Sequence, residues 1–259
     1  MVRKIKHFIR YVLREAYRAI RKGYAMYYIL GILVLCLLAN IAMACFRSIY
    51  GMNDGSFSYN LIIFAEGAFV IPYYSCIILA DIIFGREYPD PHIKDGVTGS
   101  MKRWELYIGK YAATLVLGGI MFAAAFILLV STTLLFGIGD VGIGWDTISD
   151  FLQKALVALP LWMAGIAIGQ CFLFAASRRR NAFIGYYIIV LLIPRLIILL
   201  ASEKIHLFPF TKLVNILITP QFQALQFYFT MDIKKCIILG AVYSIIASTI
   251  GIISFYKRK

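Results

Sequence analysis

Three ionisable residues lie within long apolar stretches of this 259-residue sequence, namely Glu66, Asp81 and Arg195. Hydrocarbon penalises charged side chains, so residues of this kind mark a functional site unless lipid headgroups satisfy them. Two interpretations are open for Glu66 and Arg195, which are predicted at matching depth. Both side chains reach the headgroups, or they pair as a polar gate on a substrate pathway. Asp81 ends its stretch, where water or Arg86 can satisfy it.

Motifs for catalysis, metal binding and nucleotide binding do not occur in the sequence. The hexapeptide Gly137 to Gly142 spells GxGxxG, but it follows a long apolar stretch instead of a strand, so we interpret it as a turn. GxxxxGK[ST], HExxH and GxSxG are all missing. The five cysteines and three histidines lack metal-ligand spacing. We therefore predict no catalytic residue, no metal site and no cofactor in this chain.

The composition is that of a membrane protein. Hydrophobic residues make up 61% of the chain and charged residues 15%, against about 45–50% and about 25% in soluble domains. Six stretches approach the roughly 20 residues that cross a bilayer as a helix, and they lack the alternation of barrel strands. The predicted class is all-α and polytopic, with spans at Tyr24 to Phe46, Leu61 to Phe84, Ile108 to Phe136, Ala155 to Ala176, Ala182 to Ala201 and Cys236 to Tyr256.

The basic residues predict the orientation of these spans. Lys and Arg outnumber Asp and Glu by 26 to 13, and 19 of the 26 fall in segments that six spans place on one side. The positive-inside rule makes this side cytoplasmic, together with both termini. Because topology accounts for the positive charge, we expect no nucleic-acid partner. We predict a multi-pass protein of the plasma membrane.

Two domains follow from this pattern. Residues 1–23 place apolar side chains at spacings of three and four, with Arg and Lys opposite, which predicts an amphipathic helix on the cytoplasmic leaflet. It acts either as a lipid-attracting anchor or as a lever that touches a cytoplasmic partner. Residues 24–259 form the six-helix membrane domain.

Three further segments of that domain stand out. Residues 85–107 form the largest cytoplasmic loop, either a docking surface or an ordinary connector, in which Ser100 can cap a helix that continues into the third span. Residues 202–235 are too apolar for a solvated loop and are interrupted at Pro220, which predicts a re-entrant or interfacial helix pair on the external face. Gly165 and Gly169 allow close helix approach, within the chain or between subunits.

The layout of these parts, with a loose motif in the loop after the second span, resembles the ABC type-2 transporter permeases. Within them it is similar to the small stand-alone subunits of bacitracin- and lantibiotic-type exporters. The motif is Glu87, a Gly- and Thr-containing turn at residues 96–99, Arg103 and Lys110. The resemblance implies that residues 5–20 form a connecting helix. It also implies a coupling element in this chain that binds in a groove of a separate ATPase subunit and includes Glu87, Ser100, Lys102, Arg103 and Glu105. Pro89 and Pro91 depart from the usual pattern.

The resemblance further implies a bacterial permease that exports an amphipathic or hydrophobic molecule, such as an antimicrobial peptide. Two permease subunits, like or unlike, would work with two ATPase chains that hold ATP and Mg, so this chain itself is not an enzyme. Two alternatives remain open, an ATP-independent secondary transporter and a non-transporting anchor or sensor. We expect the external exit to be lined by Phe222, Phe227, Tyr228 and Phe229.

Overall fold

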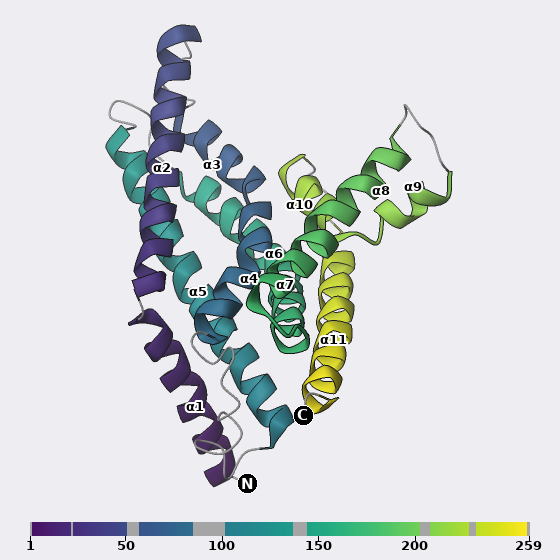
Figure 1. Ribbon diagram of the computed structural model, residues 1–259. Helices are drawn as coiled ribbons and strands as arrows, with labels where there is room; N and C mark the ends of the chain where they lie inside the picture. Colours follow the sequence, from purple (N-terminus) through teal and green to yellow (C-terminus); the bar gives the residue numbers. More distant parts are fainter. Residues whose placement is uncertain are drawn as a thin grey trace.

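The computed structural model describes residues 2–21, 23–50, 57–84, 102–136, 144–202, 208–227 and 232–257. Within these ranges all regular secondary structure is helical, as predicted (Figure 1). In chain order the helices are α1 (Val2–Ile20), α2 (Gly23–Tyr50), α3 (Phe57–Gly67), α4 (Val70–Phe84), α5 (Arg103–Phe136), α6 (Trp145–Ala175), α7 (Arg179–Tyr187), the π-helix η4 (Ile188–Leu192), α8 (Ile193–Ala201), α9 (Phe208–Val214), α10 (Ile218–Phe227) and α11 (Ile233–Lys257).

The helices include five or six segments that are long and apolar enough to cross a membrane. Five are continuous and lie in α2, α5, α6, α7 to α8, and α11. A sixth results if α3 and α4, which meet at a bend of 54°, are counted as one span. Five of the six predicted stretches therefore fall on continuous helices of this kind, and the stretch from Leu61 to Phe84 falls on the bent pair. The chain has the composition and architecture of a polytopic membrane protein.

Helix α6 lies at the centre of the bundle and packs against α4 and α11 (Figure 1). Small residues allow these close approaches. A Cβ atom at Gly169 would lie 3.0 Å from Cα of Ile77 on α4, and one at Gly240 of α11 would lie 2.5 Å from the carbonyl oxygen of Pro160. Backbones that come this near gain van der Waals contact, which is the main source of helix association in lipid.

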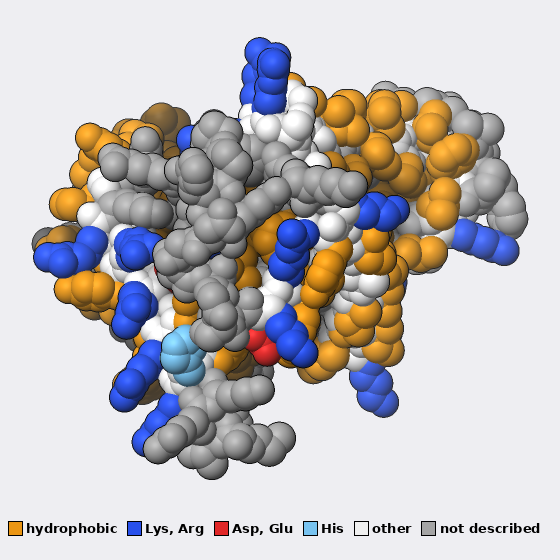
Figure 2. Space-filling model, turned by 60° about the horizontal axis from the view of Figure 1, so that its bottom comes forward, with side chains coloured by type: hydrophobic (Ala, Val, Ile, Leu, Met, Phe, Trp, Pro, Cys, Tyr) orange, Lys and Arg blue, Asp and Glu red, His pale blue; other side chains and the backbone are white. Residues whose placement is uncertain are grey.

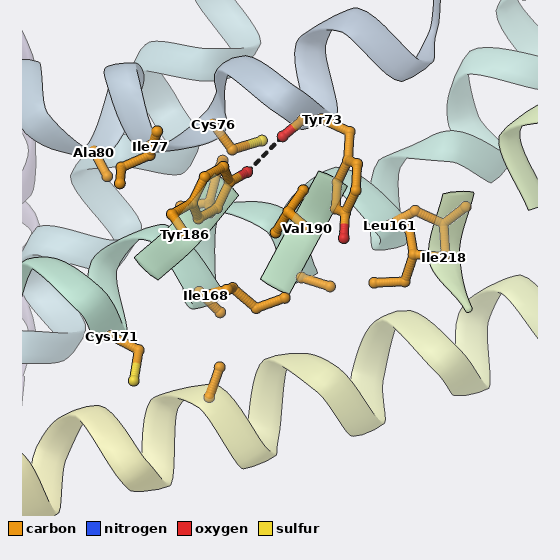
Figure 3. Packing of buried hydrophobic residues seen from close by; sticks show 14 of the residues in the cluster. Tyr73, Cys76, Ile77, Ala80, Leu161, Ile168, Cys171, Tyr186, Val190 and Ile218 are labelled. Atoms are coloured by element: carbon orange, nitrogen blue, oxygen red, sulfur yellow. Dashed lines mark hydrogen bonds between the residues drawn. The ribbon is translucent and has the colours of Figure 1, made fainter. Parts of the chain in front are cut away.

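Polar bonds fix the neighbouring helices in this core. The buried hydroxyl of Tyr186 on α7 donates to the carbonyl oxygen of Tyr73 on α4 at 2.6 Å (Figure 3). Val190, in the π-helical turn, is also fully buried in the same cluster. Pro194 has no N–H to bond the carbonyl four residues before it, and the chain adjusts with a longer bond from the Ile193 N–H to the carbonyl of Ile188.

Helix α1 packs on the bundle with part of its apolar side. Val12, Ala16 and Ala19 are buried, while Ile9 and Leu13 stay exposed. The helix meets α5 where Gly109 leaves room for a tyrosine ring. Residues 2–20 are therefore helical, with one apolar stripe in contact with protein and the neighbouring apolar stripe exposed.

Candidate functional site

A cavity of about 530 Å³ lies between α2, α4, α5 and α6. Its size is within the range of ligand pockets, about 300–1,000 Å³. Leu156 and Leu159 on α6 and Gly119 on α5 belong to its wall and are also exposed, so the cavity opens at the side of the bundle. Other lining residues are Ile32, Pro72, Leu79, Leu115, Met121, Phe122, Trp162 and Ile166.

The polar atoms in this wall bond to the protein. The hydroxyl of Tyr28 on α2 lies 3.0 Å from Oγ of Ser75 on α4. The indole N–H of Trp162 donates at 2.9 Å to the carbonyl oxygen of Phe69, at the bend between α3 and α4. The cavity therefore offers a mainly apolar lining, which suits a hydrocarbon or aromatic group better than an ion.

Four helices come together at one end of the bundle through an aromatic cluster. The ring of Phe174 on α6 lies 4.5 Å from that of Phe84 on α4, 4.7 Å from Tyr107 on α5 and 4.7 Å from Phe255 on α11, measured between centroids. Helix α5 begins at this end and also lines the cavity, so it connects the two.

Arg103 ties the start of α5 to the end of α11. Its guanidinium donates to the carbonyl oxygens of Phe255 and Tyr256 at 3.4 and 3.3 Å and lies over both rings. The last carbonyls of a helix lack intrahelical partners and carry negative partial charge, so an arginine stabilises them. Beside it, the Glu105 carboxylate accepts the Lys102 backbone N–H at 2.9 Å, which caps the start of α5.

The predicted coupling residues are only partly described. Lys102 and Arg103 are exposed at the start of α5, whereas Glu87 and Ser100 lie outside the described residues. Lys110, expected at the opening of the third span, is instead buried within α5, with its ammonium 4.8 Å from the centroid of the Phe84 ring. The reason is that α5 begins seven residues before Lys110, at Arg103.

This end of the molecule carries a basic surface. Figure 2 shows Lys and Arg side chains spread over the face that includes it. Asp81 is buried and pairs with Arg179, whereas Arg86, its predicted partner, lies outside the described residues. Among the described residues of segment 2–21, the start of α5, residues 178–180 and the end of α11, the exposed basic residues are Lys6, Arg10, Arg14, Arg18, Arg21, Lys102, Arg103, Arg178, Arg179, Arg180 and Lys257.

The proposed pair of Glu66 and Arg195 does not form. Glu66 is 2% exposed and bonds the ammonium of Lys154 on α6 at 2.7 Å, which also contacts Asp150 at 2.8 Å. The predicted fourth span begins at Ala155, one residue after Lys154, and therefore omits this lysine, whereas α6 begins at Trp145. The spacing of Asp150 and Lys154, one helical turn apart, was the available signal.

Two other predictions concern packing. Phe222 is 2% exposed and lies between the rings of Tyr73 and Trp162, so it belongs to the core and does not line an open exit. Tyr228, Phe229 and the side chain of Phe227 lie outside the described residues. Gly165 and Gly169 face Tyr73 and Ile77 of α4. Of the two predicted uses of these glycines, packing within the chain and contact between subunits, the structure shows the first.

Residues 202–235 were predicted as a helix pair interrupted at Pro220. They contain two short helices, α9 and α10, but the break lies at residues 215–217, and Pro220 belongs to the first turn of α10, where its missing N–H needs no helical partner. Comparison with known proteins adds no identification. The chain matches no protein-family model, and no curated protein sequence matches it significantly.

Proposed function

We propose that this chain is the membrane-spanning permease subunit of an ATP-driven exporter that moves an amphipathic or hydrophobic molecule, such as an antimicrobial peptide. The observation that carries the proposal is the apolar cavity, because its volume, lining and exposed rim suit a molecule that enters from lipid. In this proposal the basic end and both termini face the cytoplasm, following the positive-inside rule.

Energy would come from separate ATPase subunits, which hold ATP and Mg. Helix α5 offers a direct mechanical route, since it runs from the basic end to the cavity wall. Arg103 and Gly119 are separated by about 24 Å at 1.5 Å per helical residue. Because Arg103 also binds the end of α11, movement of the docked start of α5 would shift two membrane helices and change the cavity's affinity for its substrate.

Helix α1 would serve as the connecting helix beside the docking surface. A buried stripe around Val12 fixes it to the bundle, while exposed Ile9 and Leu13 are free to enter the leaflet. Exposed Arg10 and Arg14 would meet anionic headgroups or the ATPase. A displacement of α1 would be passed to α5 through their contact at Gly109.

A second permease subunit, identical or related, would complete the pathway. The cavity is open at Leu156 and Gly119, so a single chain leaves one side of it without a protein wall. Helix α2, which borders the cavity, has 6% of its most apolar stretch buried within the chain, which leaves ample surface for such a contact.

The alternatives predict different features. A secondary transporter uses unpaired ionisable groups near the midplane as proton or ion ligands, whereas Glu66 and Asp81 have cationic partners. An anchor or sensor would not stimulate an ATPase. These differences make ATP hydrolysis the informative measurement.

The test is co-purification with an ATPase that carries GxxxxGK[ST], encoded in a neighbouring reading frame. We expect Arg103→Gln to lower permease-stimulated ATP hydrolysis roughly fivefold or more, because about fivefold is the lower end of the effects that allosteric coupling typically produces. Arg180→Gln, which removes another exposed arginine, is the matched control. Normal assembly and turnover with Arg103→Gln would contradict the coupling role, and no stimulation by the wild-type chain would favour the anchor or sensor.

A further inference from the structure

A second hollow, of about 780 Å³, lies on the other side of α4 from the apolar cavity. Val70 and Tyr74 of α4 border this hollow, whereas Pro72 and Cys76 border the apolar cavity. Residues four apart share one helix face, so α4 separates the two spaces. The other walls of the second hollow come from α8, Ser202 and α10, through Arg195, Ile198, Leu199, Thr219 and Gln223.

Arg195 gives this hollow a positive charge without a protein counter-charge. The residue is exposed, and within the part of the chain that the structure describes its guanidinium has no ion-pair or hydrogen-bond partner. The hollow is lined by no acidic side chain among the described residues. An isolated arginine within a membrane span is unfavourable unless something outside the chain neutralises it.

A second polar group in the hollow is also unsatisfied. Thr219 is 5% exposed, and its hydroxyl is buried without a hydrogen-bond partner among the described residues. Gln223 and Tyr74 supply an amide and a phenol to the same hollow. Arginine, hydroxyl and amide groups are the donors that bind phosphate oxygens.

The apolar part of the site fits a lipid. Ile198 and Leu199 line the hollow beside Arg195, and the neighbouring Leu196 is half exposed on α8. Arg195 lies six residues before the last residue of the span, Ala201, which is about 9 Å along a helix. An arginine side chain can reach the headgroup level from this depth.

We infer that the hollow between α4, α8 and α10 binds the phosphate headgroup of a phospholipid, with Arg195 and Thr219 holding its oxygens and α8 contacting its acyl chains. This site is separate from the proposed transport cavity and does not depend on an ATPase. A lipid bound here would contact the first turns of α4 just after the bend, and so would stabilise the bent form of α3 and α4.

The test is native mass spectrometry of the purified full chain titrated with phosphatidylglycerol. We expect Arg195→Gln to weaken lipid binding roughly tenfold or more, as loss of a charge-assisted hydrogen bond predicts, and Thr219→Val to weaken it less. Arg180→Gln, which removes a charge at the other end of the same span, should bind like the wild type. Equal binding by the wild type and Arg195→Gln would overturn the assignment.

Two further probes separate the lipid from other ligands. Diacylglycerol with the same acyl chains lacks the phosphate and should bind much more weakly, whereas equal binding would show that apolar contacts suffice and would overturn the proposal. Glycerol phosphate should not compete at the lipid's concentration, and full competition would mean that the site takes free phosphate esters instead. If Arg195→Gln does not yield folded protein, Arg195→Lys replaces it and should still weaken binding, because lysine lacks the planar fork.

Discussion

Helices α2 and α6 have similar lengths but opposite positions in the molecule. In α6, 56% of the most apolar stretch is buried within the chain, against 6% in α2. Hydrophobicity does not cause this difference, because lipid tails are as apolar as leucine and provide no force that drives apolar helices together. Instead α6 carries Gly165 and Gly169, which admit α4, and Lys154, which binds Glu66. Close packing and polar bonds select the central helix of this bundle.

The largest effect should come from breaking the ion pair of α6. Lys154→Met leaves the carboxylate of Glu66 buried without its main partner, and we expect the free energy of unfolding to fall by about 3–5 kcal/mol. Unfolding of the purified chain in increasing denaturing detergent measures it.

Two variants control this experiment. The double variant Glu66→Gln with Lys154→Met should recover most of the stability, because no unpaired charge remains. Lys234→Met removes an exposed lysine from α11 and should have little effect. Equal unfolding of Lys154→Met and the wild type would show that the pair does not hold α3 against α6.

A smaller effect is expected at the contact of α6 with α11. Gly240→Ala places a methyl group 2.5 Å from the backbone of Pro160, and the helices must separate, at a cost of about 1–3 kcal/mol. In α2, a Cβ atom at Gly31 meets nothing within 4 Å, so Gly31→Ala should not destabilise. Thermal unfolding compares the two. The comparison of α2 with α6 fails if both variants behave alike.

The positions of the apolar helices could be predicted from the sequence because span length and hydropathy are local properties. The bend between α3 and α4 was not predicted, although Pro72 in the first turn of α4 has no N–H to bond the carbonyl of Ala68 and is a local signal for it. The indole of Trp162, which donates to the carbonyl of Phe69 at the bend, is a distant partner that no local pattern reveals. The same applies to Asp81, whose partner Arg179 follows it by 98 residues.

The candidate site was predictable only in part. Arg103 was singled out by the motif that carries the family resemblance. Its bonds to the carbonyls of Phe255 and Tyr256 involve backbone atoms that no side-chain pattern reveals. Phe222 was predicted to line an exit because its segment is aromatic. That prediction was wrong because the contacts of Phe222 with Tyr73 and Trp162 are tertiary and cannot be read from the segment itself. Arg195 was noticed from its depth, but its surroundings come from α4 and α10.

The smallest effect should appear at one of the polar bonds that connect α2 to its neighbours. Buried Asn40 donates to the hydroxyl of Thr132 on α5 at 3.1 Å. Thr132→Val removes this acceptor and should cost about 0.6 kcal/mol, a typical value for interhelical hydrogen bonds in membranes. The adjacent Thr133 bonds a carbonyl of its own helix, so Thr133→Val is the matched control. Detergent unfolding that ranks Thr133→Val as equally damaging would contradict an interhelical role.

The central claim is that the cavity between α2, α4, α5 and α6 receives a hydrophobic substrate. Its most direct test measures substrate-stimulated ATP hydrolysis in vesicles that contain the chain and its ATPase. Gly119 belongs to the exposed rim of the cavity, and a Cβ atom there meets nothing within 4 Å, so Gly119→Trp should obstruct the opening of the cavity without displacing a neighbour. Gly31→Trp adds the same ring to an equally open position that does not line the cavity. The account predicts that stimulation is lost in Gly119→Trp and kept in Gly31→Trp. Full stimulation in Gly119→Trp would contradict it.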